Sequence, residues 1–271
     1  MGGHIHVAGV AGVGMSALAQ ALCWTHDRVT GSDRLLDRGQ SLPVLDALRA
    51  SGVELVPQDG SAMNAQTEAV VYSTAIEEEN PDFAAARRAG VPMKHRAAVL
   101  AELAQGKTVL AVAGTAGKTT TTGMLGWTLE QLGADPTVIN GGALVDWAGP
   151  GRVGNVRRGG PDAPWVVEVD ESDRSLLNFH PEWSILTNIS QDHFTLAGVQ
   201  DLFRAYAAQV KTGIVCGEGV ATVLGSLTAP VAELPEPPVH TGGEWAVPWR
   251  GQRLCVPQPG AHNALNALLA A

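Results

Sequence analysis

The sequence predicts an α/β protein with two parallel-sheet domains: a Rossmann-like domain over residues 1–105 and a second α/β domain over residues 106–271. Short apolar runs alternate with segments of helical apolar spacing along the chain. Glycine turns follow several of these runs, and 32 glycines among 271 residues are typical of many tight α/β connections. Strands that alternate with helices usually lie parallel in a sheet covered on both faces, so we expect this arrangement in each domain.

The first domain is predicted from pairs of strands and helices. A strand over Ile5–Ala8 precedes a glycine loop over Gly9–Gly14 and a helix over Met15–Trp24. Later strands are expected at 29–32 and 69–72, and later helices at 42–50, 81–89 and 96–104. A glycine loop between a strand and a helix can hold a pyrophosphate, because the helix N-terminus presents unpaired N–H groups.

The second domain is predicted to start near Gly106. Its strands are expected at 109–112, 137–139, 165–169, 183–186 and 213–216, and its helices at 118–132, 199–210 and 261–271. Two glycine- or proline-rich segments lack a clear period. We expect 141–160 to be a surface loop and 230–260 to be weakly structured.

The stretch Thr108–Gly123 reads as a phosphate-binding loop. An apolar run ends in Gly114-Thr115-Ala116-Gly117, and Lys118 and four threonines follow at the start of a helical pattern. The strict Walker pattern fails because Val112 stands where its first glycine belongs. In such loops the lysine reaches the outer phosphates and the first hydroxyl holds Mg²⁺. The alternative is an ordinary glycine turn before a threonine-rich helix.

Acidic and imidazole groups follow two later strands of the second domain. Glu168 and Asp170 alternate with valines and therefore face one side of their strand, and His193 follows Asp192 after the next strand. Strand carboxyl ends line the ligand crevice of an open parallel sheet, so these groups could complete a Mg²⁺–ATP site. Alone, Glu168 could equally be a solvated edge carboxylate and His193 a structural histidine.

The N-terminal loop leaves two ligands open. Gly9, Gly12 and Gly14 give G-x-x-G-x-G instead of the dinucleotide pattern G-x-G-x-x-G, and Asp33 closes the next strand where a ribose-binding acid would sit. A nicotinamide dinucleotide therefore competes with other pyrophosphates at this loop. A purely structural glycine turn is the third alternative.

Composition excludes several classes of protein. The net charge is −9 and no basic run is present, so nucleic-acid binding is not expected. Cys23, Cys216 and Cys255 lack metal-like spacing, which is typical of reduced thiols in a cytoplasmic protein. No apolar run reaches membrane-spanning length, and the strand and glycine loop at the N-terminus do not resemble a signal peptide.

As a set, eight stretches resemble the Mur ligases in family order along nearly the whole chain. They are GVAGVGMSALA (9–19), GSD (31–33), YSTAI (72–76), HRAAVLAEL (95–103), AGTAGKTTT (113–121), EVDESDRSLL (168–177), TNISQDH (187–193) and PGAHNALNAL (259–268). The resemblance is strongest to the members that add L-alanine to UDP-N-acetylmuramate in peptidoglycan precursor synthesis. It implies that ATP phosphorylates the muramate carboxylate and that the amino acid displaces the phosphate.

The resemblance also implies roles for individual residues. Lys118, Glu168 and His193 match catalytic residues, and Thr119, Glu168 and His193 match the residues that serve the metal sites. The residues that match the ATP site are Gly114, Thr115, Ala116, Gly117, Lys118, Thr119, Thr120 and Asn263. Those that match the UDP-sugar site are Gly12, Val13, Gly14, Met15, Ser16, Asp33, Ser73 and Thr74. A UDP-sugar thus explains the N-terminal loop better than a nicotinamide dinucleotide does.

Two departures from the family pattern shape the expectations. Ala116 stands where the L-alanine-adding members usually carry histidine, which removes a polar side chain from the loop. The chain ends at Ala271, so we expect an incomplete second domain, no third domain and poor turnover by this chain alone. A non-catalytic UDP-sugar- and ATP-binding accessory protein is the alternative function. The sequence leaves the oligomeric state open.

Overall fold

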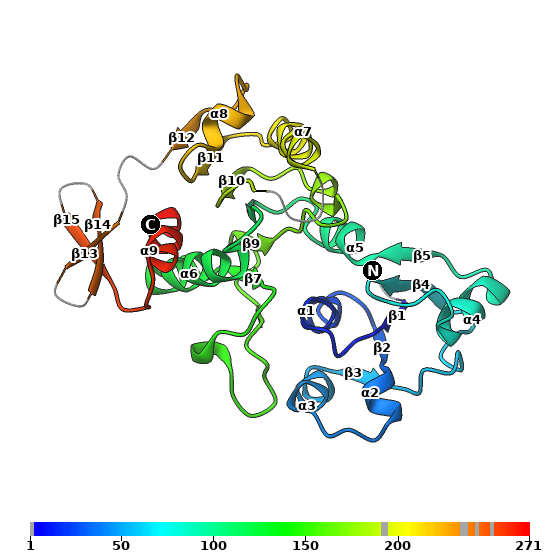
Figure 1. Ribbon diagram of the computed structural model, residues 1–271. Coiled ribbons are helices and arrows are strands. Elements are labelled where there is room, and N and C mark those ends of the chain that lie inside the picture. The colour runs from blue at the N-terminus through cyan, green and yellow to red at the C-terminus, as the bar shows by residue number, and fades with distance from the viewer. Residues whose placement is uncertain (1–2, 191–194, 234–237, 242–243, 250–251) are drawn as a thin grey trace. The chain divides into compact units, whose positions relative to one another are not determined.

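The computed structural model describes residues 3–190, 195–233, 238–241, 244–249 and 252–271 (Figure 1). The chain divides into two compact units. The first comprises Met1–Gln105 and Ile139–Arg158, and the second comprises Gly106–Val138 and Gly159–Ala271. Each unit is an α/β structure with its own sheet, which confirms the predicted fold class.

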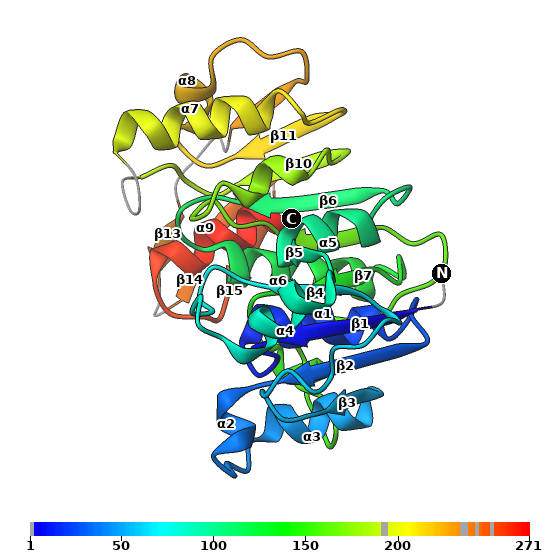
Figure 2. The same ribbon diagram turned by 90° about the vertical axis from the view of Figure 1, so that its right-hand side faces the viewer.

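The sheet of the first unit has five strands in the order β3-β2-β1-β4-β5, and neighbouring strands in this order pair in parallel. Its strands are β1 (His4–Ala8), β2 (Arg28–Ser32), β3 (Val53–Leu55), β4 (Thr67–Tyr72) and β5 (Met93–His95). The order of β1, β2 and β3 can be followed in Figure 2. The register pairs Ala8 with Ser32, so the turns after β1 and β2 leave the sheet at one edge.

Helices cover both faces of this sheet. They are α1 (Val13–Leu22), α2 (Arg34–Asp37), α3 (Pro43–Ala50), α4 (Pro81–Ala89) and α5 (Arg96–Leu103). Figure 1 shows α1, α3 and α5 on one face and α4 on the other. Phe83 and Ala86 of α4 pack against Ala8 and Val70 of the sheet, and all four are buried.

In the sheet of the second unit, the strand that leads into the predicted phosphate loop is an inner strand, β6. The strand order is β12-β11-β10-β6-β9-β7-β8, and β11, β10 and β6 can be followed in Figure 2. The strands are β6 (Val109–Ala113), β7 (Thr137–Ile139), β9 (Trp165–Glu168), β10 (Trp183–Leu186), β11 (Gly213–Cys216), β12 (Val231–Glu233) and the two-residue β8 (Val156–Arg157), which comes from the segment grouped with the first unit. Parallel pairing joins β6 to β9 and to β10, so their carboxyl ends lie at the same edge.

Helices cover this sheet as well. They are α6 (Lys118–Gln131), α7 (Leu196–Ala207), α8 (Val220–Leu224), α9 (Ala261–Ala270) and the 3₁₀ turn η2 (Ser175–Asn178). Leu269 of α9 is buried against Val112 and Ile185, and Leu125 of α6 packs on the same cluster. Helices α6 and α9 therefore share one face of the sheet. None of the helices in the described part of the chain is long and apolar enough to cross a membrane.

Two segments differ from the expectation. Residues 230–260 were expected to be weakly structured, but they contain an antiparallel sheet of β13 (Val239–Thr241), β14 (Glu244–Trp249) and β15 (Gln252–Val256). Val247 and Val256 are buried against Ala264 and Leu268 of α9. Proline and glycine obscure the strand pattern here, and packing on a helix stabilises the sheet.

The glycine-rich segment 141–160 is not simply a surface loop. It holds the 3₁₀ turn η1 (Val145–Trp147), and Ile139–Arg158 groups with the first unit. Asn155 is fully buried, and its Nδ2 donates to the Val13 carbonyl oxygen at 2.9 Å and to Ser16 Oγ at 3.0 Å. A buried amide with such partners holds its segment in place.

Candidate functional site

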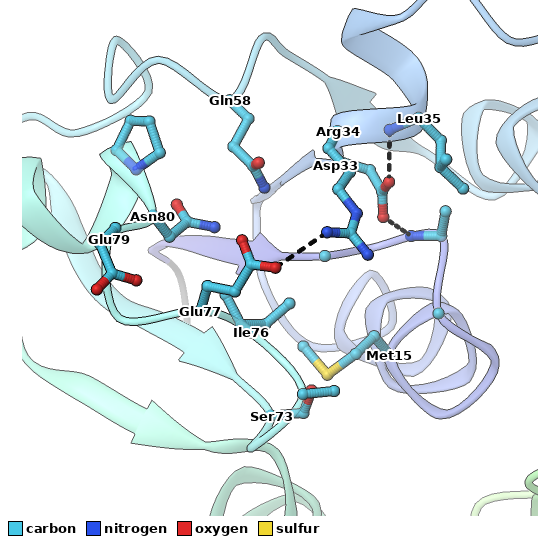
Figure 3. A pocket seen from close by; sticks show the side chains of 15 residues that line it. Met15, Asp33, Arg34, Leu35, Gln58, Ser73, Ile76, Glu77, Glu79 and Asn80 are labelled. Carbon is cyan, nitrogen blue, oxygen red and sulfur yellow. Dashed lines mark hydrogen bonds and ion pairs between the residues drawn. The ribbon is translucent and has the colours of Figure 1, made fainter.

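A cavity of about 390 Å³ opens at the carboxyl edge of the first sheet (Figure 3). It is lined by residues that follow three neighbouring strands: Gly9 to Gly12 after β1, Asp33 after β2 and Ser73 after β4. Of the predicted UDP-sugar residues, Gly12, Met15, Asp33 and Ser73 line this cavity. The edge is where ligands of open parallel sheets bind.

Asp33 holds the glycine loop in shape. Its Oδ2 accepts a hydrogen bond from the Ala11 N–H at 3.0 Å, and its Oδ1 accepts one from the Leu35 N–H at 2.9 Å as the N-cap of α2. Both bonds are drawn in Figure 3, and Asp33 is only 6% exposed. One carboxylate oxygen thus positions the loop and the other caps α2, which sequence spacing could not reveal.

The other predicted sugar-binding residues do not line the cavity: Val13, Gly14, Ser16 and Thr74. Ser16 is fully buried, and its Oγ donates to the Val13 carbonyl oxygen at 2.9 Å. A Cβ on Gly14 would lie 3.0 Å from Arg96 Nη1, so a small residue suits this close approach.

Polar residues that the sequence analysis did not single out complete the cavity wall. Arg34 Nη1 and Glu77 Oε1 form an ion pair at 3.2 Å, drawn in Figure 3, and Gln58 and Asn80 also line the cavity. Asn80 accepts a hydrogen bond from the Asp82 N–H as the N-cap of α4. An asparagine directly before a proline-led helix was the available sequence signal for that residue.

In the second unit, Gly114 to Gly117 form a tight turn between β6 and α6. Gly114 has a φ of +133°, and a Cβ there would collide with Thr187 Oγ1. Gly117 has a φ of +84°, and a Cβ there would lie 2.6 Å from Asn266 Oδ1. Only glycine fits both conditions, so the turn can bring its backbone close to a bound anion.

Lys118 begins α6, and its ammonium lies over this turn. Its Nζ is 2.9 Å from the Gly114 carbonyl oxygen and 2.7 Å from Glu171 Oε2. Asp170 Oδ1 is more distant, at 4.0 Å. Burial raises the pKa of the Glu171 carboxyl above its ordinary value, although the bond from Lys118 opposes that rise. The positive helix N-terminus and the ammonium together suit a phosphate.

Thr119 and Glu168 bring two oxygen ligands together. Thr119 Oγ1, in the first turn of α6, donates to Glu168 Oε1 at the carboxyl end of β9 at 3.1 Å. The two residues meet because β9 pairs with β6, the strand that leads into α6. Oxygen donors suit Mg²⁺, which usually takes one or two protein ligands and completes its shell with phosphate and water. His193, the third predicted metal residue, lies outside the described residues. Within the described ranges, no group of three histidine, cysteine or acidic side chains could hold a metal ion.

The segment after β10 binds the phosphate loop from one side. Asn188 Oδ1 accepts from the Ala116 N–H at 3.1 Å, and Asn188 Nδ2 donates to the Ala116 carbonyl oxygen at 2.8 Å. Thr187 Oγ1 also donates to that carbonyl oxygen, at 2.6 Å. The run Thr187-Asn188-Ile189 after a predicted strand indicated polar groups at the sheet edge. No local pattern indicated that their partner would be Ala116.

The remaining predicted ATP residues are less closely tied to the loop. Asn263 lies in the first turn of α9, and its Nδ2 donates to the Pro259 carbonyl oxygen at 2.8 Å. Asn266, one turn later and 6% exposed, is the residue that approaches Gly117. Thr120 is exposed in the first turn of α6.

Family comparisons cover both units. The profile described as "Mur ligase family, catalytic domain" matches residues 4–108, and the profile described as "Mur ligase middle domain" matches residues 112–208. Matches to two profiles of one family, in this order, decide the assignment. The chain belongs to the Mur ligase family.

Two curated relatives of this Mur ligase carry the same name. A UDP-N-acetylmuramate–L-alanine ligase of Symbiobacterium thermophilum is 37% identical over 97% of the chain and 58% of its own length. The protein of the same name from Gloeobacter violaceus is 40% identical over 78% of the chain and 44% of its own length. The chain thus spans roughly half the length of these curated relatives.

Solved Mur ligase structures share the fold. UDP-N-acetylmuramate–alanine ligase of Thermotoga maritima aligns over 99% of the chain and 64% of its own, with 27% identity and a TM-score of 0.81. A UDP-N-acetylmuramate:L-alanyl-γ-D-glutamyl-meso-diaminopimelate ligase of Neisseria meningitides aligns over 100% of the chain and 92% of its own, with 25% identity and a TM-score of 0.82.

Proposed function

We propose that this Mur ligase takes part in the ATP-dependent joining of L-alanine to UDP-N-acetylmuramate. The observation that carries the proposal is the phosphate loop at the N-terminus of α6, where the Lys118 ammonium and the Thr119–Glu168 oxygen pair lie at one sheet edge. The cavity at the edge of the first sheet supports a second, sugar-nucleotide site. The names of the similar proteins supply the substrate class.

The proposed reaction has two steps. A muramate carboxylate oxygen attacks the γ-phosphorus of ATP, the bond to the β-bridging oxygen breaks, and an acyl phosphate and ADP form. The amine nitrogen then attacks the carbonyl carbon, inorganic phosphate leaves, and the nitrogen loses a proton. In both steps the protein orients the reactants and neutralises charge, and Lys118 is the cation placed for this role. Bound Mg²⁺ would neutralise phosphate charge, with Thr119 and Glu168 as its ligands.

L-alanine is the proposed amine because both curated relatives carry the name of the L-alanine ligase. The similar Neisseria structure is named for a tripeptide amine and for the same UDP-N-acetylmuramate. The sugar nucleotide is therefore the part of the proposal that these relatives share. Asp33 also favours it over a nicotinamide dinucleotide, since its carboxylate already binds two backbone N–H groups.

Calorimetric titration of the full chain tests the proposal. We expect binding of UDP-N-acetylmuramate and of MgATP and no binding of NADH. In a separate phosphate-release assay we expect only slow release that depends on L-alanine, in line with the poor turnover expected of this chain. Lys118→Met should weaken MgATP affinity at least tenfold and leave UDP-N-acetylmuramate affinity unchanged. Lys107→Met is the matched control, because Lys107 donates to the Pro161 carbonyl oxygen in an exposed hydrogen bond of the same unit, away from the phosphate loop.

Three outcomes separate the alternatives. Binding of both ligands without phosphate release, in the presence of L-alanine, would favour the non-catalytic accessory protein. Tight NADH binding without UDP-N-acetylmuramate binding would favour a dehydrogenase. Equal MgATP affinity in Lys118→Met and the parent chain would contradict the role given to the phosphate loop.

A further inference from the structure

One side chain, that of Asn188, binds both the backbone N–H and the backbone carbonyl oxygen of Ala116. The planar amide of Asn188 accepts from that N–H at 3.1 Å and donates to that carbonyl oxygen at 2.8 Å. An asparagine amide carries an acceptor and two donors, so it can satisfy both groups of one residue at once. Aspartate has no donor for the carbonyl, and alanine has neither group.

Neighbouring bonds reinforce this contact. The Thr115 N–H donates to the Asn188 carbonyl oxygen at 3.1 Å, and the Ser190 N–H donates to Thr115 Oγ1 at 3.0 Å. The phosphate loop is therefore bonded to the segment after β10 through two successive residues, Thr115 and Ala116. All of these bonds join protein groups, so the loop can be held in this shape by the protein itself.

A preformed loop affects both the affinity and the position of a phosphate. Ordering a flexible loop on binding costs free energy that a preformed loop avoids. The Ala116 N–H is already used by Asn188, whereas the first N–H groups of α6, from Lys118 onward, have no partner within the helix. The loop thus offers a phosphate the N–H groups that follow Ala116.

We propose that Asn188 is a positioning residue. By binding the backbone N–H and carbonyl oxygen of Ala116, it fixes the turn and so presents the N–H groups at the start of α6 to the nucleotide phosphates. The inference rests on the proposed function, because it takes a nucleotide as the ligand of this loop. It assigns a role to a side chain that reaches the phosphates only through the loop backbone. It also accounts for a loop that stays formed with alanine at position 116.

Three variants at Asn188 test the proposal. Asn188→Ala removes both bonds, and we expect MgATP and ADP affinity to fall about tenfold, which is about 1.4 kcal/mol. Asn188→Asp keeps the acceptor but turns a carboxylate toward the Ala116 carbonyl and the phosphates, so its loss should be larger. Asn188→Ser retains a smaller donor and acceptor and should lie between parent and alanine variant.

Asn178→Ala is the matched control. Asn178 Nδ2 donates to the Ser175 carbonyl oxygen at 2.8 Å in the same unit, so this variant also loses an asparagine–backbone bond. Its nucleotide affinity should stay within about twofold of the parent value, as expected for loss of a bond outside the site. UDP-N-acetylmuramate affinity should be unchanged in all four variants.

Hydrogen exchange of the ligand-free proteins separates positioning from nucleotide recognition. In Asn188→Ala we expect faster exchange in peptides that cover 114–119, with parent-like exchange in β6 and β10. Unchanged exchange there, or parent-like nucleotide affinity in folded Asn188→Ala and Asn188→Ser, would overturn the proposal. If the parent chain does not bind MgATP, the proposed function fails, while the exchange comparison still decides whether Asn188 forms the loop.

Discussion

A buried carboxylate lies beside the lysine that the phosphate loop presents. The Lys118 side chain is 14% exposed and that of Glu171 is 4% exposed, and their charged atoms are 2.7 Å apart. A buried charge needs a partner, so each of these groups keeps the other in place. A phosphate bound at this loop must share the Lys118 ammonium with Glu171.

Glu171→Gln should therefore tighten nucleotide binding. The amide oxygen can still accept from Lys118, but the negative charge that competes with the phosphates is gone. We expect a three- to tenfold lower Kd for ADP, or ~1 kcal/mol, by calorimetry. Glu182→Gln is the matched control, because Glu182 forms an equally short 2.7 Å pair with Lys211 at the other end of β10. Weaker ADP binding by Glu171→Gln alone would instead mean that the lysine needs the full charge to stay in place.

At the scale of elements, a buried polar network joins β1, β2 and α4. Asp82 Oδ2 accepts from Ser32 Oγ at 2.5 Å and lies 3.3 Å from His6 Nε2, and all three residues are fully buried. Asp82 Oδ1 accepts from the Gly60 N–H at 3.0 Å. The network sits beside the cavity, since Ser32 precedes Asp33 and Asp82 follows Asn80 by two residues.

Stability of the first unit should depend on Asp82 in a pH-dependent way. Burial alone would raise the pKa of this carboxyl, but bonds from His6, Ser32 and Gly60 outweigh burial and lower it below 3.8. A lowered folded pKa means that the stabilisation is present above 3.8 and is lost as pH falls through the folded value. Asp82→Asn should cost about 2–3 kcal/mol at pH 7, measured by urea unfolding.

The difference between Asp82→Asn and the parent should shrink as the pH is lowered below 3.8. Asp46→Asn is the control, because the pair that Asp46 forms with Arg49 is exposed and contributes little. A stability difference that stays constant from pH 7 to pH 3 would show that the charge of Asp82 does not matter.

Helix α6 carries hydroxyl groups that burial leaves unpaired. Thr121 and Thr122 are fully buried, and neither Oγ1 has a hydrogen-bond partner among the described residues. A buried polar group without a partner is destabilising, and valine has the same branched shape without the hydroxyl. We expect Thr122→Val to raise the free energy of unfolding by about 1 kcal/mol in urea titrations. Thr120→Val is the control, because Thr120 lies on the exposed side of the helix and its replacement should change the free energy of unfolding little. A loss of stability in Thr122→Val would instead point to a bond between the Thr122 hydroxyl and an internal water.

At the scale of the whole molecule, each unit has its own glycine loop between a strand and a helix. The loop after β1 borders the cavity of the first unit, and the loop after β6 holds Lys118 in the second. In both loops, glycine allows the backbone to turn so that N–H groups at a helix N-terminus can face an anion. The proposed ligands are correspondingly two anions, a sugar nucleotide and ATP.

Each ligand alone should protect its own loop. In hydrogen exchange of the full chain, UDP-N-acetylmuramate should slow exchange in peptides covering 9–16, and MgATP should slow exchange in peptides covering 114–119. A protein saturated with both should show both effects. Protection of 9–16 by MgATP alone, with 114–119 unchanged, would mean that the ligands were assigned to the wrong loops.

Local patterns in the sequence determined the two strand–turn–helix segments that carry the predicted phosphate sites. The strand, glycine turn and helix around Lys118 are neighbours in the chain, and so are those around Gly12, because backbone conformation and apolar spacing act over a few residues. Glu168 was predictable beside Thr119 on a different ground, since β9, which ends at Glu168, and β6, which leads into the helix of Thr119, were expected to end at one sheet edge. The role of His193 stays a prediction, as that residue lies outside the described part of the chain.

Tertiary structure alone decided which polar groups meet. Glu171 joins Lys118 across 53 residues, and Asn188 joins Ala116 across 72. Asn155 enters the first unit from a segment that was expected to be a surface loop. Contacts over such separations depend on strand order, register and burial, and the free energy of a buried charge or amide depends on the partner it meets. The sequence therefore determined where phosphates could bind, while packing decided which side chains hold the loops that would bind them.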